Sequence, residues 1–168
     1  MSDTVTRLGP GTLRGDTGAK SSHEHDEDIH PVGHVAEAAL LGACLLIPEA
    51  STTIAKVMVA DDFDREAHRT LFLAIRRLIE RDEPCDVVSV TVELADFHQL
   101  DEVGGPLGVS SLLEPSVTAP ESWVHYVNLV QREAQRRDLI GAYRKAIRDL
   151  QDGADPDGFE LPEVVVPV

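Results

Sequence analysis

The sequence is poor in aromatic residues and in cysteine. Only 4% of its 168 residues are aromatic although 42% are hydrophobic, so a core must consist mainly of Leu, Val, Ile and Ala. The only cysteines, Cys44 and Cys85, lack CxxC spacing, which favours free thiols in a reducing compartment over a disulfide. The length suits one domain with tails.

The chain also lacks a segment typical of membrane insertion or export. No apolar run approaches the roughly 18 residues that are needed to span a bilayer. Residues 1–20 do not show the charged-then-apolar order of a signal peptide. We therefore expect a cytoplasmic protein that does not associate with membranes.

Basic residues are scarce. The sequence has 15 Lys and Arg against 30 Asp and Glu, which gives a net charge of −15. Such a chain repels nucleic acid, because affinity for phosphates comes chiefly from Lys and Arg. Residues 121–150 oppose this trend, with six Lys and Arg against four Asp and Glu, a net +2. Direct nucleic-acid binding is disfavoured, and only this stretch could support it.

Motifs for catalysis are missing as well. The sequence has no GxxxxGK[ST] phosphate loop, and Gly104-Gly105 has neither the preceding strand nor the Lys of such a loop. His68 has no Cys or Ser partner nearby in the sequence, and we interpret it as a core or capping histidine. The sequence therefore predicts no catalytic residue, no cofactor and no enzyme activity.

Two groups of residues could in principle bind a metal ion. Residues 23–34 hold four histidines among acidic residues, and such ligands can bind zinc or nickel. A solvated acidic arm is the favoured interpretation, because ligands on a flexible arm lose entropy on binding. Asp61, Asp62 and Asp64 resemble half of a calcium loop whose other ligands are missing. We interpret them as a turn and a helix cap, and expect no metal.

The chain divides into an arm, a helical domain and a tail. Residues 1–33 have almost no apolar pattern and predict a disordered, acidic and histidine-containing arm. Residues 151–168 contain Pro and Gly residues that interrupt any helical pattern, and they predict an extended tail. The intervening residues 34–150 predict an all-α fold, with a compact multi-helix head over 34–117 and one long helix over 118–150.

Apolar spacing places the helices of the head. Residues 34–47 are apolar on nearly all sides and predict a buried central helix, followed by a second helix from Pro48. Asp64 can cap a third helix. The β-branched run at 86–92 could form a strand, but a helical stripe that starts after Ser89 as cap favours a helix.

A corner is predicted between the head and the long helix. Gly104 and Gly105 end the fourth helix, because glycine readily adopts the positive φ of a chain reversal. A short fifth helix follows and ends at Pro115, and Thr118 with Glu121 has capping-box spacing. We interpret the two glycines as a structural turn.

The long helix carries an apolar stripe beside a row of basic side chains. The row is either a salt-bridged exposed face or a docking face for a partner. Because burial of one apolar side chain contributes about 1.5–3 kcal/mol, an exposed stripe favours a homodimer. The alternative is a monomer in which Phe159 and the VVVPV tail cover the stripe. The predicted interface comprises Val127, Val130, Ile140, Tyr143, Ile147, Arg132, Arg136, Arg137 and Arg144.

Five segments, in order and spacing, resemble the N-terminal domain of the DnaB-type replicative DNA helicase family over residues 34–150. They are EAALLGACLL (37–46), FDREAHRTLFLAI (63–75), PCDVVSVTVEL (84–94), LDEVGGPLGVSSL (100–112) and YVNLVQREAQRRDLI (126–140). The resemblance implies an all-helical head followed by a long helix. It further implies a domain that self-associates into a collar, receives primase and loader proteins, and is not itself the ATPase.

The sequence departs from the family pattern at Ala38, His98 and Gly108, and we expect no motor domain after the long helix. Two functions remain open. The chain is either a non-catalytic accessory or regulator of the helicase–primase machinery, or a helical adaptor recruited to another partner or to DNA. In the first case its partners are itself and the replicative helicase, primase or a loader. In the second, the basic face of the long helix makes the contact.

Overall fold

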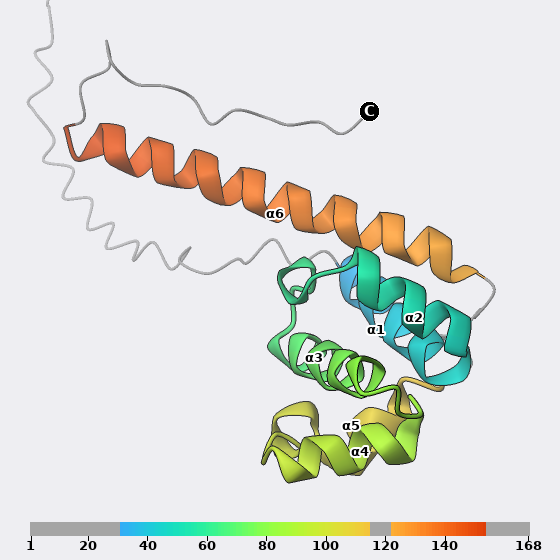
Figure 1. Cartoon of the computed structure of the whole chain (residues 1–168). Helices are drawn as coiled ribbons and strands as arrows, with labels where there is room; N and C mark the ends of the chain where they lie inside the picture. Colours follow the sequence, from blue (N-terminus) through green and yellow to red (C-terminus); the bar gives the residue numbers. More distant parts are fainter. Residues whose placement is uncertain (1–30, 115–121, 154–168) are drawn as a thin grey trace, which may run out of the picture.

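The computed structural model describes residues 31–114 and 122–153, and these residues are helical without strands (Figure 1). The predicted all-α fold is confirmed. In chain order the elements are α1 (Pro31–Leu46), α2 (Pro48–Val57), the 3-10 helix η1 (Ala60–Asp62), α3 (Glu66–Glu80), α4 (Val87–Asp96), the 3-10 helix η2 (Asp101–Val103), α5 (Gly105–Ser111) and α6 (Trp123–Gln151). Predictions for the arm before residue 31 and the tail after 153 lie outside the described residues.

α1 is the central helix of the head, which we define as residues 31–114. It packs against α2, α3 and α6, and its Leu40, Leu41 and Cys44 are fully buried. The apolar run at 34–47 therefore predicted its place correctly, although the helix begins earlier, at Pro31. Proline is tolerated in a first helical turn because its missing N–H would have no partner there.

A small aromatic pair lies at the middle of the core. The rings of Phe63 and Phe72 are both fully buried, with centroids 5.0 Å apart. The surrounding core is aliphatic, as the composition predicted, and includes Leu40, Ile54, Met58, Ile75, Leu94 and Val130. Burial of Cys44 raises the pKa of its thiol, and both Cys44 and Cys85 are free.

The β-branched run at 86–92 is helical. α4 begins at Val87 because Asp86, rather than Ser89, is its N-cap: the Asp86 carboxylate accepts the Ser89 amide N–H at 2.8 Å. This bond stabilises the charged carboxylate and lowers the pKa of Asp86. The same kind of correction applies to α3, whose N-cap is Arg65 rather than the predicted Asp64.

The glycine corner is present, but it does not end the fourth helix as predicted: α4 ends at Asp96, and η2 lies between α4 and Gly104. Gly104 and Gly105 have φ angles of 86° and 69°, a left-handed conformation that most residues avoid, and α5 starts directly at this turn. The predicted capping box of Thr118 and Glu121 lies outside the described residues. α6 begins at Trp123, five residues after the predicted start, and runs for 29 residues to Gln151, one residue past the predicted end.

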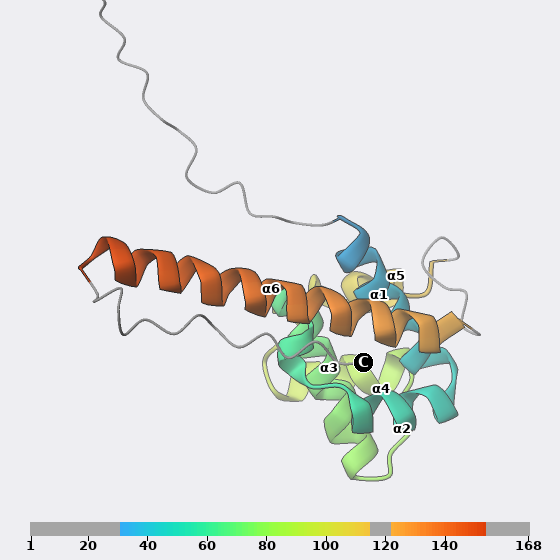
Figure 2. The same cartoon turned by 90° about the horizontal axis from the view of Figure 1, so that it is seen from above.

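α6 lies along one side of the head and extends well beyond it (Figures 1 and 2). Its N-terminal part packs against α1 and η1, whereas its C-terminal part projects away from the head. α4 and α5 lie on the side of the head opposite α6. Among the described residues, no helix is both long and apolar enough to cross a membrane.

Gly108 and Gly141 should respond in opposite directions to alanine. A Cβ at Gly108 would lie 2.8 Å from the carbonyl carbon of Val103 and closer still to its oxygen. A Cβ at Gly141 would have no such neighbouring atom within 4 Å. In urea unfolding we expect Gly108→Ala to lower the free energy of unfolding by about 1–3 kcal/mol. Gly141→Ala should raise it by about 0.5–1 kcal/mol, since alanine restricts the unfolded chain. Shifts of the same sign would contradict this packing.

Candidate protein-interaction surface along the long helix

The N-terminal part of α6 is attached to the head by apolar contacts. Val127 and Val130 are only 8% and 1% exposed, and Ala134 is also buried. Both valines belong to the core cluster that includes α1. These two members of the predicted interface therefore pack against the head, which leaves them little surface for a partner. The sequence shows one continuous stripe, and the head covers its first half.

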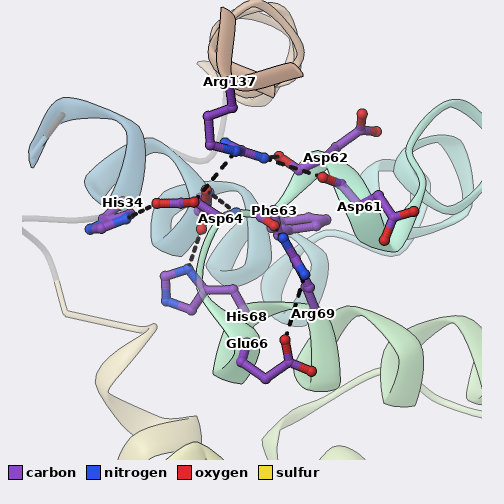
Figure 3. Close-up of polar contacts among 10 residues, drawn as sticks. His34, Asp61, Asp62, Phe63, Asp64, Glu66, His68, Arg69 and Arg137 are labelled. Carbon is purple, nitrogen blue, oxygen red and sulfur yellow. Dashed lines mark hydrogen bonds and ion pairs between the residues drawn. The ribbon is translucent and has the colours of Figure 1, made fainter. Parts of the chain in front are cut away.

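Arg137 adds a polar anchor between α6 and the head (Figure 3). Its Nη2 donates to the backbone carbonyls of Asp61 and Asp62 at 3.2 and 2.9 Å. Its Nε lies 3.4 Å from Oδ1 of Asp64. Arg137 therefore contacts its own chain through these atoms, and its side chain remains 28% exposed. One guanidinium thus hydrogen-bonds two carbonyls and forms an ion pair with one carboxylate of the segment that precedes α3.

Asp64 links α1 to α6. Its Oδ2 lies 2.7 Å from Nε2 of His34 in α1, and its backbone N–H donates to Oε1 of Glu37 at 2.8 Å. Burial by itself would raise the pKa of Asp64, but the bond to His34 and the charge of Arg137 outweigh this and lower it. Asp64 thus connects α1 and α6 instead of capping α3.

A buried pair lies beneath this link. Glu37, only 2% exposed, places its Oε2 2.7 Å from Nδ1 of the buried His68. Every polar side-chain atom buried in the described part of the chain has a hydrogen-bond partner. His68 is therefore a core histidine held by a carboxylate, as the sequence suggested, and its partner is 31 positions away.

The metal-binding alternatives find no support in the described geometry. Asp62 accepts the Val59 amide N–H at 2.8 Å, while Asp64 is occupied by His34 and Arg137, so the acidic run forms a turn and a link between helices. No group of three or more potential ligands converges within 31–114 or 122–153. The histidines at 23, 25 and 30 lie outside these ranges.

A second polar cluster, which the sequence did not reveal, joins α3 to α4. Glu93 is buried and is hydrogen-bonded by Arg81 and by Arg77, the latter at 2.6 Å. The bond from Arg81 contributes most to the lowered pKa of Glu93. Arg77 also lies over the ring of Phe97, 4.2 Å from its centroid. The one feature of the sequence that could have predicted this cluster is the single Glu within the apolar stripe of α4.

The exposed side chains of α6 are the remaining candidate surface; Arg132 and Arg136 lie on its docked part, and the others on the part that projects. Tyr143 and Ile147 are 36% and 54% exposed, and Ile140 is half-buried. Arg132 and Arg144 are exposed, as is Arg136, whose guanidinium lies 3.7 Å from Glu133. Lys145 donates to Asp149 at 2.8 Å. These six predicted residues, namely Ile140, Tyr143, Ile147, Arg132, Arg136 and Arg144, are hereafter the α6 surface, and their role stays a prediction.

Comparison with known proteins places this architecture in a family. The model of the DnaB-like helicase N terminal domain matches residues 30–132. The replicative DNA helicase DnaB of Geobacillus stearothermophilus is 39% identical over 127 residues, which cover 76% of this chain and 27% of the relative. DnaB of Mycobacterium leprae is 31% identical over 135 residues, 80% of this chain and 22% of the relative.

A solved structure agrees. The N-terminal domain of DnaB helicase from Mycobacterium tuberculosis superposes with a TM-score of 0.67 at 30% identity, covering 72% of this chain and 86% of that one. The chain thus spans about a quarter of the length of the full helicases that it matches, and the match falls on their N-terminal domain. With its helical head, its glycine corner and its long docked helix, the chain belongs to the DnaB-like helicase N-terminal domain family.

Proposed function

We propose that this chain is a non-catalytic protein-interaction module that associates with itself through α6 and acts in DNA replication as an accessory or regulator of the helicase–primase machinery. Its family membership supports the connection with replication. In that family the corresponding domain self-associates and receives primase and loader proteins. The replicative helicase, primase or a loader are accordingly the partner classes to test first.

The observation that carries the proposal is the uneven burial of α6. The head buries its first half through Val127 and Val130 and fixes it through Arg137, while Tyr143 and Ile147 remain exposed on the half that projects. A helix held rigidly at one end presents the other in a defined direction. Preorganisation of this kind lowers the entropy that a partner must offset on binding.

Direct DNA binding through the basic face of α6 is less well supported. Arg137 is engaged with the head, and Arg136 and Lys145 lie beside Glu133 and Asp149. These carboxylates offset part of the positive charge that would attract phosphates. The net charge of −15 opposes such binding further.

Light scattering of the chain alone, and mixed with the cognate helicase or primase, tests the proposal. We expect a homodimer alone and a heavier complex with at least one of the two proteins. A parallel titration with duplex DNA covers the alternative. Binding to DNA that weakens steeply with salt, without a complex with either protein, would replace the proposal with the DNA adaptor.

We expect no hydrolysis of ATP or GTP by the purified chain. The sequence contains no phosphate loop, and within residues 31–114 and 122–153 no three His, Cys, Asp or Glu side chains gather as a metal site would need. Phosphate release should equal that of a blank, with the intact helicase as positive control. Turnover that co-purifies with the chain and follows its concentration would contradict a non-catalytic role.

A further inference from the structure

A pocket of about 350 Å³ lies between the α1–α2 corner and the loop that joins α3 to α4. Leu45, Leu46 and Ile79 supply its apolar lining, and α6 contributes no residue to it. Leu46 is about half exposed, so apolar surface is open to solvent there. This volume is at the small end of ligand pockets, and it suits one or two apolar side chains better than a cofactor.

The rim of this pocket is acidic and carries no basic side chain. Asp82, Glu83 and Asp86 line it, and no Lys or Arg occurs in the sequence between Arg81 and Arg132. Glu83 is paired with Arg81 at 3.0 Å, whereas Asp82 is exposed and forms no ion pair with the described residues. The rim therefore keeps at least one uncompensated carboxylate beside the apolar part of the pocket.

The backbone holds this rim in place. The amide N–H groups of Asp82 and Glu83 donate to the carbonyls of Ile79 and Leu78 at the end of α3, at 3.0 and 2.9 Å. Asp82 has a φ of 58°, which turns the chain sharply there. The C-terminal end of α3 adds a partial negative charge. α2 also begins at this pocket, but Pro48 at its start has no N–H to offer an anion.

We infer that this pocket is a docking site for a cationic amphipathic helix of a partner protein, which inserts an apolar side chain and places Lys or Arg one turn away against Asp82 and Glu83. The inference rests on the proposed function, because it supplies the protein-binding module with a second surface, separate from α6. Charge complementarity selects the occupant: a helix with an acidic or neutral polar face gains nothing from this rim.

The test uses a fluorescein-labelled amphipathic helical peptide of leucine and lysine as the probe, and measures its anisotropy on titration with the full chain. Its control is the same peptide with glutamate in place of lysine. We expect saturable binding of the lysine peptide and none of the glutamate peptide. Equal binding of both would overturn the inference.

Thr52 and Thr53 provide a matched pair for the pocket itself. Both are exposed on α2 and bond their hydroxyl to the carbonyl one turn earlier, but only Thr52 lines the pocket. Thr52→Trp should fill the pocket and weaken the lysine peptide about tenfold, as expected for the loss of an apolar anchor. Thr53→Trp should stay within about twofold of the unsubstituted chain.

Two acidic pairs provide the matched test of charge. Asp82→Asn with Glu83→Gln should weaken the peptide about fivefold, the usual scale for two exposed charges. Asparagine tolerates the positive φ of Asp82, so the loop is kept. Asp101→Asn with Glu102→Gln removes the same charge from exposed residues of η2 and should change affinity by less than about twofold.

The remaining outcomes separate this site from the proposed function. Equal losses from both acidic pairs, or no loss from Thr52→Trp, would show non-specific attraction and overturn the site. If the Thr52→Trp variant had a lower mass in light scattering than the wild type, a second copy of this chain would occupy the pocket. That result would overturn the inference of a different partner protein. If the chain bound the lysine peptide at the pocket but formed no complex with helicase or primase, the docking site would stand. The proposed replication partners would then be wrong.

Discussion

Replacing Glu37 with leucine should lower the free energy of unfolding by about 3–5 kcal/mol, the usual cost when one partner of a buried polar pair is removed. Leucine is similar in size to glutamate, so the loss comes from hydrogen bonds and not from a cavity. Two groups lose their acceptor at once: the backbone N–H of Asp64 and the ring of His68. Each buried group left without a partner costs about 1–3 kcal/mol.

The position of Glu37 explains why we expect so large an effect. It joins α1 to the segment before α3, and the same segment receives Arg137 from α6 through Asp64. Loss of the Glu37 carboxylate therefore weakens the attachment of α6 to the head as well as the packing of the core. We expect the variant to melt earlier and to show weaker protection of the amides of residues 61–69 from hydrogen exchange.

Urea unfolding followed by circular dichroism measures this loss. Glu80→Leu is the matched control, because Glu80 is an exposed helical glutamate in an i,i+4 pair with Arg76. Such exposed pairs contribute about 0.3–0.5 kcal/mol. A loss in Glu37→Leu no larger than that in Glu80→Leu would show that the buried pair does not hold the helices together.

Local patterns predicted the elements of this fold well. The apolar spacing of α1 and α3, the proline at the start of α2 and the glycine corner all report hydrogen bonds and packing among near neighbours. Helix and strand were close alternatives only at 86–92, where propensity and periodicity disagreed. The packing of Val90 and Leu94 and the Asp86 cap resolve this in favour of helix.

The site could not be predicted to the same depth, because its contacts are distant in sequence. Asp64 has a good local sequence context for a cap, yet its carboxylate is engaged by His34 and Arg137, 30 and 73 positions away. In the sequence, Arg137 cannot be distinguished from the other arginines of α6. Only its contacts with the head set it apart. In the same way, the stripe from Val127 to Ile147 is uniform in sequence, and only the extent of the head divides it into a buried and an open part.

The α6 surface leads to the last expected result: Ile140→Asp with Ile147→Asp should convert a homodimer into a folded monomer. Ile147 is 54% exposed and Ile140 half-buried in the isolated chain, and both lie on the projecting part of α6. Burial of an apolar side chain contributes about 1.5–3 kcal/mol, and a two-fold interface buries each residue twice. A charge at both positions would have to be desolvated in the dimer.

Light scattering at equal micromolar concentrations measures the outcome, with circular dichroism to show that the helices persist. The matched control is Val88→Asp with Val92→Asp, which places two aspartates on exposed positions of α4, on the side of the head opposite α6. The control should keep the dimer mass. An unchanged mass in the α6 variant would place the interface elsewhere, and a wild type that is monomeric would remove self-association from the proposed function. If both variants became monomeric, the loss would reflect added charge in general, because the two surfaces share no residue.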